Sequence, residues 1–284
     1  MTRLAVVGGG FMGSQIATQA ALHGIDVRLQ DVSEEQLEKS MELNRGHLRR
    51  RVDKGRMTET DLEDTLARIR TTTDLAQSVT DAEAVIEAIV EDLGAKRDLF
   101  AQLGALAPPE AILASNSSTI VISKLADVTG RPQLCANMHF FSPVLVMELC
   151  EVVMGPQTSE ATAERCLELV REMGRTPVLL RKEVDGFVVN RILHAATQEA
   201  YRLLDSGVAD FKDIDIAVEK GLNWPLGPFR LGDFTGLDIT YHARKHIYET
   251  TGDPASKPSE RLREKVEKGE LGRKTGKGWY DYDP

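Results

Sequence analysis

The chain has 284 residues, enough for one large domain or two of ordinary size with a substantial core. Hydrophobic residues make up 42% of the sequence and charged residues 28%, which is typical of a globular protein with a hydrated surface. The formal net charge of -9 argues against nucleic-acid binding as the main role, because neutralising phosphates requires a basic surface.

The cysteine pattern predicts neither a disulfide framework nor a metal site. Cys135, Cys150 and Cys166 are widely spaced and form no C-x-x-C pair. We expect them to be small buried side chains in a protein of the reducing cytoplasm. The first ten residues do not follow the pattern of a signal peptide, because glycines interrupt a short apolar run. No stretch approaches the roughly 18 apolar residues of a membrane span, so we expect no membrane association.

The first 31 residues predict a strand, a glycine turn, a helix and a second strand that ends at Asp31. Within the turn, Gly8, Gly10 and Gly13 fit the pattern G-x-G-x-x-G. The first glycine permits a tight turn, the second lets a pyrophosphate approach the backbone, and the third allows close helix–strand packing. Because the pattern follows a strand and opens a helix, it predicts dinucleotide binding rather than an ordinary turn.

Asp31 indicates which dinucleotide is bound. It lies 18 residues after Gly13, where a carboxylate can accept hydrogen bonds from the adenosine ribose hydroxyls. A carboxylate facing the 2′-phosphate of NADP would be an unfavourable like-charge contact. The sequence therefore predicts NAD as the cofactor.

The next segment is charged and helical. Residues 44–70 predict two amphipathic helices around K-G-R-M-T, with Thr58 as an N-cap and Asp61 in the first turn of the second helix. The first of these carries a basic run, residues 47–56. Such a run is usually a solvated helix face. It is also a candidate partner for the phosphates of a ligand, with Arg50 and Lys54 as the binding residues.

Strands and helices then alternate as far as residue 182. Strands are predicted at 84–88, 112–115, 134–140, 147–153 and 177–180, and helices at 93–106 and 159–173. This alternation predicts a mostly parallel, doubly wound sheet of the Rossmann type, covered on both faces.

The residues after 182 predict helices and no strand, at 184–204, 210–220, 236–250 and 259–268. We therefore expect an α/β domain at 1–183 with an inserted helical hairpin, followed by an all-α domain at 184–284.

His139 lies in an apolar run, C-A-N-M-H-F-F, that predicts a buried strand. A histidine there is either a core residue with a satisfied hydrogen bond or a group that moves a proton. An imidazole takes and returns a proton near neutral pH, and a carboxylate on its far nitrogen would fix the tautomer and stabilise the imidazolium. Glu151 follows 12 residues later, and the two can meet if they lie on adjacent strands joined through Ser142 and Pro143.

Several ordered motifs resemble those of one family, the L-3-hydroxyacyl-CoA dehydrogenases, and most of all the short bacterial 3-hydroxybutyryl-CoA dehydrogenases. In chain order they are G-x-G-x-M-G, E-A-I-V-E-D, A-S-N-S-S, H-F-F-S-P, D-G-F-V-V-N-R, P-L-G-P and L-G-R-K-T-G-K-G-W-Y. The resemblance extends over essentially the whole chain. It implies reversible hydride transfer between NAD and carbon 3 of a 3-hydroxyacyl-CoA, and a second domain that builds a homodimer.

The resemblance also implies roles for individual residues. His139 takes the position of the general base and Glu151 that of the carboxylate that holds it. Ser118 and Asn190 match polar residues around the reacting oxygen and the thioester. The residues that match positions on the nicotinamide and ribose side are Glu91, Lys96 and Asn116.

Two positions depart from the family pattern. Ser142 stands where the family usually has asparagine in H-F-F-N-P, and Trp224 stands where it often has histidine in N-H-P-M-G-P. Both departures concern substrate fit more than the type of reaction. Acyl chain length, physiological direction and pathway are left open by these motifs.

Two other functions are compatible with the same fold. One is a dehydrogenase of free hydroxy acids or sugar acids that does not use CoA. The other is a non-catalytic NAD-binding protein, against which the presence of His139, Glu151, Ser118 and Asn190 argues.

Overall fold

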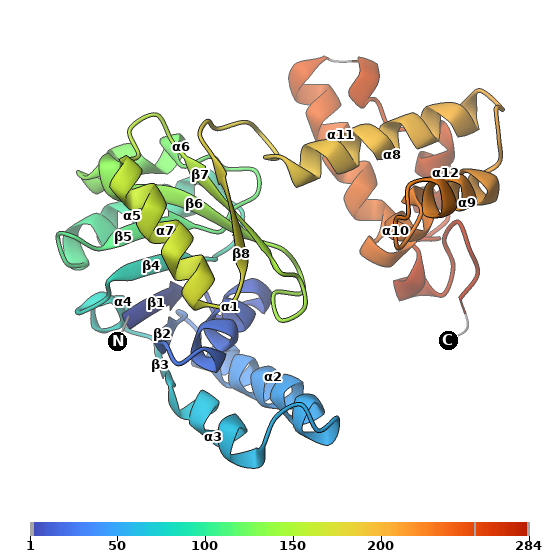
Figure 1. Cartoon of the computed structure of the whole chain (residues 1–284). Helices are drawn as coiled ribbons and strands as arrows, with labels where there is room; N and C mark the ends of the chain where they lie inside the picture. The colour runs from blue at the N-terminus through green and yellow to red at the C-terminus, as the bar shows by residue number, and fades with distance from the viewer. Residues whose placement is uncertain (1–2, 253, 283–284) are drawn as a thin grey trace. The chain divides into compact units, whose positions relative to one another are not determined.

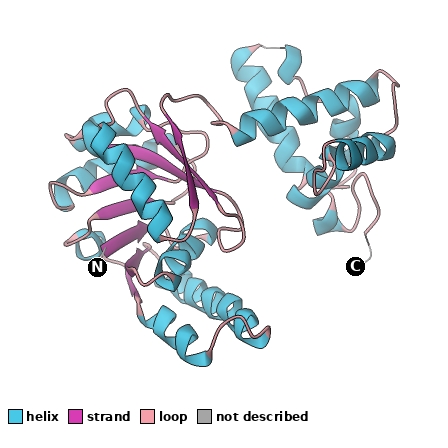
Figure 2. Cartoon of the chain, in the orientation of Figure 1, coloured by secondary structure: helices cyan, strands magenta, loops and turns pink. Residues whose placement is uncertain are grey.

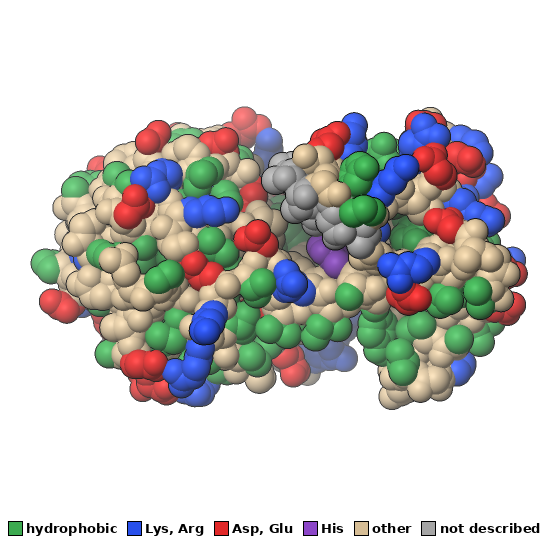
Figure 3. Space-filling model, turned by 90° about the horizontal axis from the view of Figure 1, so that it is seen from above, with side chains coloured by type: hydrophobic (Ala, Val, Ile, Leu, Met, Phe, Trp, Pro, Cys, Tyr) green, Lys and Arg blue, Asp and Glu red, His purple; other side chains and the backbone are tan. Residues whose placement is uncertain are grey.

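The computed structural model describes residues 3–252 and 254–282. The chain divides into two compact units, Met1–Phe187 and Val188–Pro284, which are described separately. Among the described residues, no helix is long and apolar enough to cross a lipid bilayer. Acidic and basic side chains are intermixed on the face drawn in Figure 3.

An eight-stranded sheet forms the centre of the first unit, in the order β3-β2-β1-β4-β5-β6-β7-β8. Its strands are β1 (Arg3–Val7), β2 (Asp26–Gln30), β3 (Ile69–Thr72), β4 (Ala84–Glu87), β5 (Ile112–Ser115), β6 (Cys135–Phe140), β7 (Leu149–Met154) and β8 (Thr176–Leu180). Neighbouring strands run parallel except for β6 and β7. The predicted doubly wound α/β architecture is confirmed, and β1 to β6 all end at one edge of the sheet.

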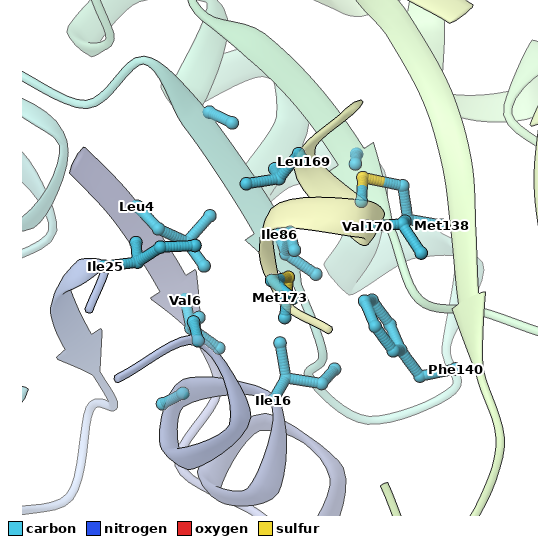
Figure 4. Packing of buried hydrophobic residues seen from close by; sticks show 14 of the residues in the cluster. Leu4, Val6, Ile16, Ile25, Ile86, Met138, Phe140, Leu169, Val170 and Met173 are labelled. Carbon is cyan, nitrogen blue, oxygen red and sulfur yellow. The ribbon is translucent and has the colours of Figure 1, made fainter. Parts of the chain in front are cut away.

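Helices cover both faces of this sheet (Figures 1 and 2). They are α1 (Phe11–Leu22), α2 (Glu34–Asp53), α3 (Glu59–Ala67), α4 (Leu75–Val79), α5 (Leu93–Leu106), α6 (Ser123–Ala126) and α7 (Glu160–Glu172). The alternation of side chains along β1 explains the two layers. Leu4 and Val6 join a core with α1 and α7, whereas Ala5 and Val7 join a second core with α5. Figure 4 shows the first core, in which Ile16 and Met173 pack against Val6 and Ile86.

The helical hairpin of α2 and α3 follows β2, as predicted. Its turn is fixed by a capping box, in which the Thr58 hydroxyl accepts from the Asp61 N–H and the Asp61 carboxylate accepts from the Thr58 N–H. The end of the predicted second helix is wrong, because Ile69–Thr72 forms the edge strand β3 and pairs with β2. A four-residue strand has too little periodicity to be recognised, and pairing with β2 decides its conformation.

The second unit is helical, as predicted. Its helices are α8 (Val189–Asp205), α9 (Phe211–Gly221), α10 (Pro228–Thr235), α11 (Leu237–Thr251) and α12 (Glu260–Glu267). The predicted start of α8 at residue 184 is wrong, because Gly186 and Phe187 adopt left-handed backbone conformations, with φ of 77° and 49°, that a helix cannot continue. Helix α10 was not predicted; it has eight residues and begins at a proline.

Two buried aspartates hold the second unit together. Asp215 on α9 accepts hydrogen bonds from the N–H groups of Phe229 and Arg230 and from the Tyr280 hydroxyl, at 2.9–3.0 Å. Asp233 on α10 accepts from the N–H groups of Trp279 and Tyr280, both at 2.9 Å. The two carboxylates therefore join α9, α10 and the C-terminal turn around a core that is rich in aromatic rings.

Candidate functional site

The glycine turn between β1 and α1 has the geometry of a dinucleotide-binding loop. Gly8 has φ of +107°, and a Cβ there would lie 2.5 Å from the Ala88 carbonyl oxygen. A Cβ on Gly13 would lie 1.9 Å from the Gly8 carbonyl oxygen, so any side chain at this position is excluded. A Cβ on Gly10 would meet nothing within 4 Å, so the backbone is open at the position where a pyrophosphate approaches. The loop therefore fits the diphosphate of NAD at the start of α1.

Asp31 follows β2 beside this loop. One carboxylate oxygen accepts from the Gly9 N–H at 2.7 Å, and the other accepts from the Ser33 N–H at 3.0 Å. Asp31 thus holds the glycine loop and the start of α2 in place. It is only half-buried, so the carboxylate can also accept from a ribose hydroxyl.

A buried polar network lies where β4 and β5 end. Glu87, the last residue of β4, is fully buried and accepts from the Lys96 ammonium at 2.5 Å, from the Ser115 hydroxyl at 2.6 Å and from the Ile89 N–H at 2.7 Å. Lys96 is also buried, so the usual solvent-facing position of a lysine on a charged helix does not apply here. The Lys96 ammonium has a second carboxylate partner, Glu91, whose Oε2 lies 3.3 Å from Lys96 Nζ.

Glu91 connects this network to the loop after β5. Its carboxylate accepts from the hydroxyls of Ser117 and Thr119. Partial burial raises the pKa of Glu91, but the hydrogen bonds from Ser117 and Thr119 and the charge of Lys96 outweigh it, so the pKa lies below its ordinary value. Glu91 therefore stays ionised at neutral pH and fixes the loop that carries Ser118.

Two amides attach the same loop to β6. The Asn116 side-chain oxygen accepts at 2.9 Å from the N–H of Phe140, the residue that follows His139. Asn137 is fully buried; its side-chain oxygen accepts from the Ile122 N–H at 2.8 Å, and its amide donates to the Ile120 carbonyl at 3.1 Å. The end of the His139 strand is thus held in register with the loop that contains Ser118, which is half-buried.

His139 and Glu151 face each other across the antiparallel pair β6 and β7. They are direct register partners, and His139 Nδ1 lies 2.9 Å from Glu151 Oε2. The side chain of His139 is 8% exposed and that of Glu151 is 1% exposed, so the pair is shielded from water. A carboxylate in this position selects the tautomer with hydrogen on Nδ1.

The other nitrogen of the ring remains available. Among residues 3–252 and 254–282, no hydrogen bond to His139 Nε2 is formed. The ring packs against Phe141 and Phe187, with centroid distances of 4.5 and 5.6 Å. The imidazole is thus fixed from one side by Glu151 and presents an unshared electron pair on the other.

The basic run on α2 is not a uniform patch. Arg45 pairs with Glu63 at 2.6 Å, and Arg49 pairs with Glu59, both on α3. Arg50 and Lys54 are exposed, and they form no ion pair with any residue that the structure describes. The two residues predicted to bind a phosphorylated ligand are therefore among the basic residues of this run whose charges are not compensated within the hairpin.

The structure brings most of the predicted residues to one edge of the sheet. At the carboxyl ends of β1, β2, β4, β5 and β6 lie Gly8, Gly10, Gly13, Asp31, Glu91, Asn116, Ser118 and His139. Asn190 lies on α8 in the second unit, and its assigned role stays a prediction. Sequence reasoning missed Glu87 and Asn137. The signal for both was a polar residue inside an otherwise apolar buried strand.

This edge defines a class of protein. A glycine loop with an acidic residue after β2 binds a dinucleotide in the crevice at the carboxyl ends of parallel strands, and a histidine–carboxylate pair at the same edge is suited to proton transfer. The combination is that of an NAD-dependent oxidoreductase. Within the described residues, no cluster of three or more His, Cys, Asp or Glu side chains is suited to hold a metal ion.

Comparison with known proteins identifies the family. Residues 3–184 match the NAD-binding domain of 3-hydroxyacyl-CoA dehydrogenase, and residues 186–282 match its C-terminal domain. The chain belongs to the 3-hydroxyacyl-CoA dehydrogenase family and is an NAD-binding oxidoreductase that acts on a CH–OH group. The resemblance found in the sequence motifs is thereby confirmed.

Individual relatives cover nearly the whole chain. The chain is 42% identical to a probable 3-hydroxybutyryl-CoA dehydrogenase of Deinococcus radiodurans over 280 residues, which are 99% of this chain and 100% of the relative. It is 40% identical to human mitochondrial hydroxyacyl-coenzyme A dehydrogenase, with 98% of this chain and 90% of the relative covered. The crystal structure of (S)-3-hydroxybutyryl-CoA dehydrogenase PaaH1 from Ralstonia eutropha is similar, with a TM-score of 0.92, 37% identity and 100% of each chain covered.

Proposed function

We propose that this protein catalyses the reversible, NAD-dependent oxidation of short-chain L-3-hydroxyacyl-CoA, with 3-hydroxybutyryl-CoA as the favoured substrate. The observation that carries the proposal is the His139–Glu151 pair, with Nδ1 held by the carboxylate and Nε2 available at the edge of the sheet where the glycine loop lies. The names of relatives such as the Deinococcus radiodurans and Ralstonia eutropha proteins support the choice of acyl group.

In the proposed mechanism, the residues of the chain handle the proton. Bound NAD supplies the acceptor for the hydride that leaves carbon 3. His139 Nε2 accepts the proton of the 3-hydroxyl group. Glu151 accepts the Nδ1–H hydrogen bond throughout and stabilises the imidazolium that forms. In the reverse direction the imidazolium returns the proton to the oxygen of the 3-keto group.

Other residues have proposed roles around this step. Ser118 and Asn190 position the reacting oxygen and the thioester. Asn116, Glu91 and Lys96 shape the nicotinamide and ribose side, and the ion pairs of Lys96 support a role in which it fixes Glu91. Gly8, Gly10, Gly13 and Asp31 bind the remainder of NAD.

The basic residues Arg50 and Lys54 are proposed to bind the phosphates of CoA, because their charges are uncompensated within the hairpin and guanidinium and ammonium groups pair well with phosphates. Residues 1–183 would form the NAD-binding domain and residues 184–284 the substrate and dimerisation domain of a cytoplasmic homodimer. Exposed apolar side chains on α8 and α11, such as Ile192 and Ile239, support a contact between copies.

The experiment is a series of NADH oxidation assays with 3-ketoacyl-CoA substrates of increasing chain length, and with free acetoacetate as the matched control without CoA. We expect turnover with acetoacetyl-CoA, a lower kcat/KM with long chains, and none with acetoacetate. Equal rates with acetoacetate would favour a hydroxy-acid dehydrogenase without CoA. NADH binding without turnover of any acyl-CoA would favour a non-catalytic protein.

The CoA patch has its own test. Charge reversal at Arg50 and Lys54 should raise the KM for acetoacetyl-CoA at low salt, and added salt should reduce the difference. Arg45→Glu is the control on the same helix, because Arg45 is already paired with Glu63. An unchanged KM at low salt would contradict the role of this patch.

A further inference from the structure

A small basic cavity lies at the opposite edge of the sheet, where the strands begin. It has a volume of about 100 Å³, enough for several water molecules. Arg3 opens β1, Arg28 lies within β2, and Arg68 and Arg70 lie just before and within β3; all four line the cavity. The strands run from here toward the glycine loop, so about 15 Å of β1 separates the cavity from the dinucleotide site.

The acidic side chains of the cavity neutralise only part of this charge. The lining contains four arginines and two aspartates, Asp26 and Asp81, a formal excess of two positive charges in a chain whose net charge is -9. Asp81 is engaged by both amino groups of Arg28, one of them at 3.2 Å, and by Arg3 at 3.7 Å. Within the part of the chain that the structure describes, Arg68 and Arg70 form no ion pair.

The backbone holds these arginines next to one another. Arg28 and Arg70 are direct register partners on β2 and β3, so their side chains leave the same face of the sheet. The Arg68 carbonyl accepts from the Val27 N–H, and the Arg3 carbonyl accepts from the Glu83 N–H, both at 2.9 Å. Like charges opposite each other destabilise a sheet, and only Arg28 of this pair has a carboxylate partner among the described residues.

We propose that this cavity is a binding site for a phosphoryl group, separate from the dinucleotide and substrate sites. Guanidinium groups bind phosphate through paired N–H donors, and a phosphate dianion has enough acceptor oxygens for Arg3, Arg68 and Arg70 at once. A carboxylate carries one charge and two oxygens and would leave part of this charge uncompensated. The ligand is either free inorganic phosphate or the terminal group of a phosphorylated metabolite.

The test is calorimetric titration of inorganic phosphate into the full chain saturated with NADH. Saturation fills the glycine loop, which would otherwise take up the anion itself, and sodium chloride keeps the ionic strength constant. We expect a dissociation constant of about 1 mM or tighter. Arg68→Gln combined with Arg70→Gln should weaken binding at least tenfold, and Arg70→Lys should weaken it less because the charge remains. Arg181→Gln, at an exposed arginine on the same unit, should leave binding unchanged.

Arg68 and Arg70 form no ion pairs with the residues that the structure describes, so the double variant should unfold at nearly the same temperature as the parent in chloride. Should it fail to fold, the two single variants serve in its place, each expected to weaken binding severalfold.

Glycerol 3-phosphate distinguishes the two candidate ligands. If it binds as tightly as inorganic phosphate, the site is open to phosphate monoesters; if it binds more weakly, the ligand is inorganic phosphate. Equal heats for the parent and the arginine variants, or no heat with the parent, would overturn the proposal.

Discussion

The two units each bury carboxylates, and these carboxylates have different partners. In the first unit Glu151 faces the imidazole of His139, whose second nitrogen has no hydrogen-bond partner among the described residues. In the second unit Asp215 and Asp233 accept from backbone N–H groups and tyrosine hydroxyls that stay protonated at neutral pH. Burial raises the pKa of Asp215, and its hydrogen bonds lower it only in part.

This difference shows that burial of a polar group does not by itself indicate a catalytic site. A carboxylate surrounded by fixed donors joins segments of the chain, and its removal should cost stability. A carboxylate paired with a group that can gain and lose a proton prepares that group for chemistry, and its removal should cost rate. Substitutions at these carboxylates and their partners should therefore separate loss of rate from loss of stability.

The largest expected effect is on turnover. Glutamine at position 139 cannot accept and return a proton, so His139→Gln should lower kcat by about 10²–10⁴-fold. NADH should still bind, because the glycine loop and Asp31, and not His139, are proposed to hold the dinucleotide. The measurement is steady-state kinetics with acetoacetyl-CoA, together with NADH fluorescence titration. Near-normal turnover would return His139 to the role of a core residue.

The second effect is on stability. Asp215→Ala leaves two backbone N–H groups and the Tyr280 hydroxyl without their acceptor, so the free energy of unfolding should fall by about 2–4 kcal/mol. Asp213→Ala is the matched control on the same helix; Asp213 is exposed, so its loss should cost less than about 1 kcal/mol. Chemical denaturation measures both. Equal losses for the two variants would remove the distinction between the two aspartates.

A smaller effect is expected at the dinucleotide site. Asp31→Ala should weaken NADH binding and reduce the preference for NAD over NADP by about tenfold, because the like charge opposite a 2′-phosphate is removed. Asp31 also holds Gly9 and Ser33, so Asp31→Asn, which keeps one acceptor, serves as the control for loop geometry. If Asp31→Ala prefers NAD over NADP as strongly as the parent does, Asp31 does not contact the adenosine ribose.

The smallest effect concerns the thiols of the three buried cysteines, which have no role in the proposed reaction. Burial raises the pKa of Cys166 to about 12, and it also raises the pKa of Cys135 and of Cys150. A raised pKa keeps a thiol protonated and unreactive at pH 8. The native protein should therefore react with no thiol reagent over minutes and should keep its activity. The denatured chain should take up three equivalents of the reagent. Rapid labelling of the native protein would show that one of these thiols is accessible.

Much of the fold was predictable from local patterns. The strand, glycine turn and helix at the N-terminus were predicted because glycines and apolar periodicity mark them directly, and the capping box at Thr58 marked the start of α3. The strand β3 and the helix α10 were missed because short elements depend on their neighbours. The first turn of the predicted α8 was wrong because sequence periodicity cannot indicate the left-handed backbone at Phe187.

The candidate site was predictable in composition and less so in geometry. The sequence permitted a contact between His139 and Glu151 if they lie on adjacent strands, and the register of β6 and β7 confirms the contact. The Glu87–Lys96 ion pair could not be predicted, because it depends on α5 packing over the end of β4. Lysine on a charged helix gives no sign in the sequence that it is buried.

His139 and Glu151 are proposed to act as one unit, and a double-mutant cycle on kcat measures the coupling between them. Glu151→Gln alone should lower kcat by about 10- to 10³-fold, because the ring loses the carboxylate that orients it and stabilises its charge. With glutamine already at position 139, the same change should have almost no further effect. If the two substitutions instead multiply their effects on kcat, Glu151 does not act through His139, and the proposed mechanism is wrong.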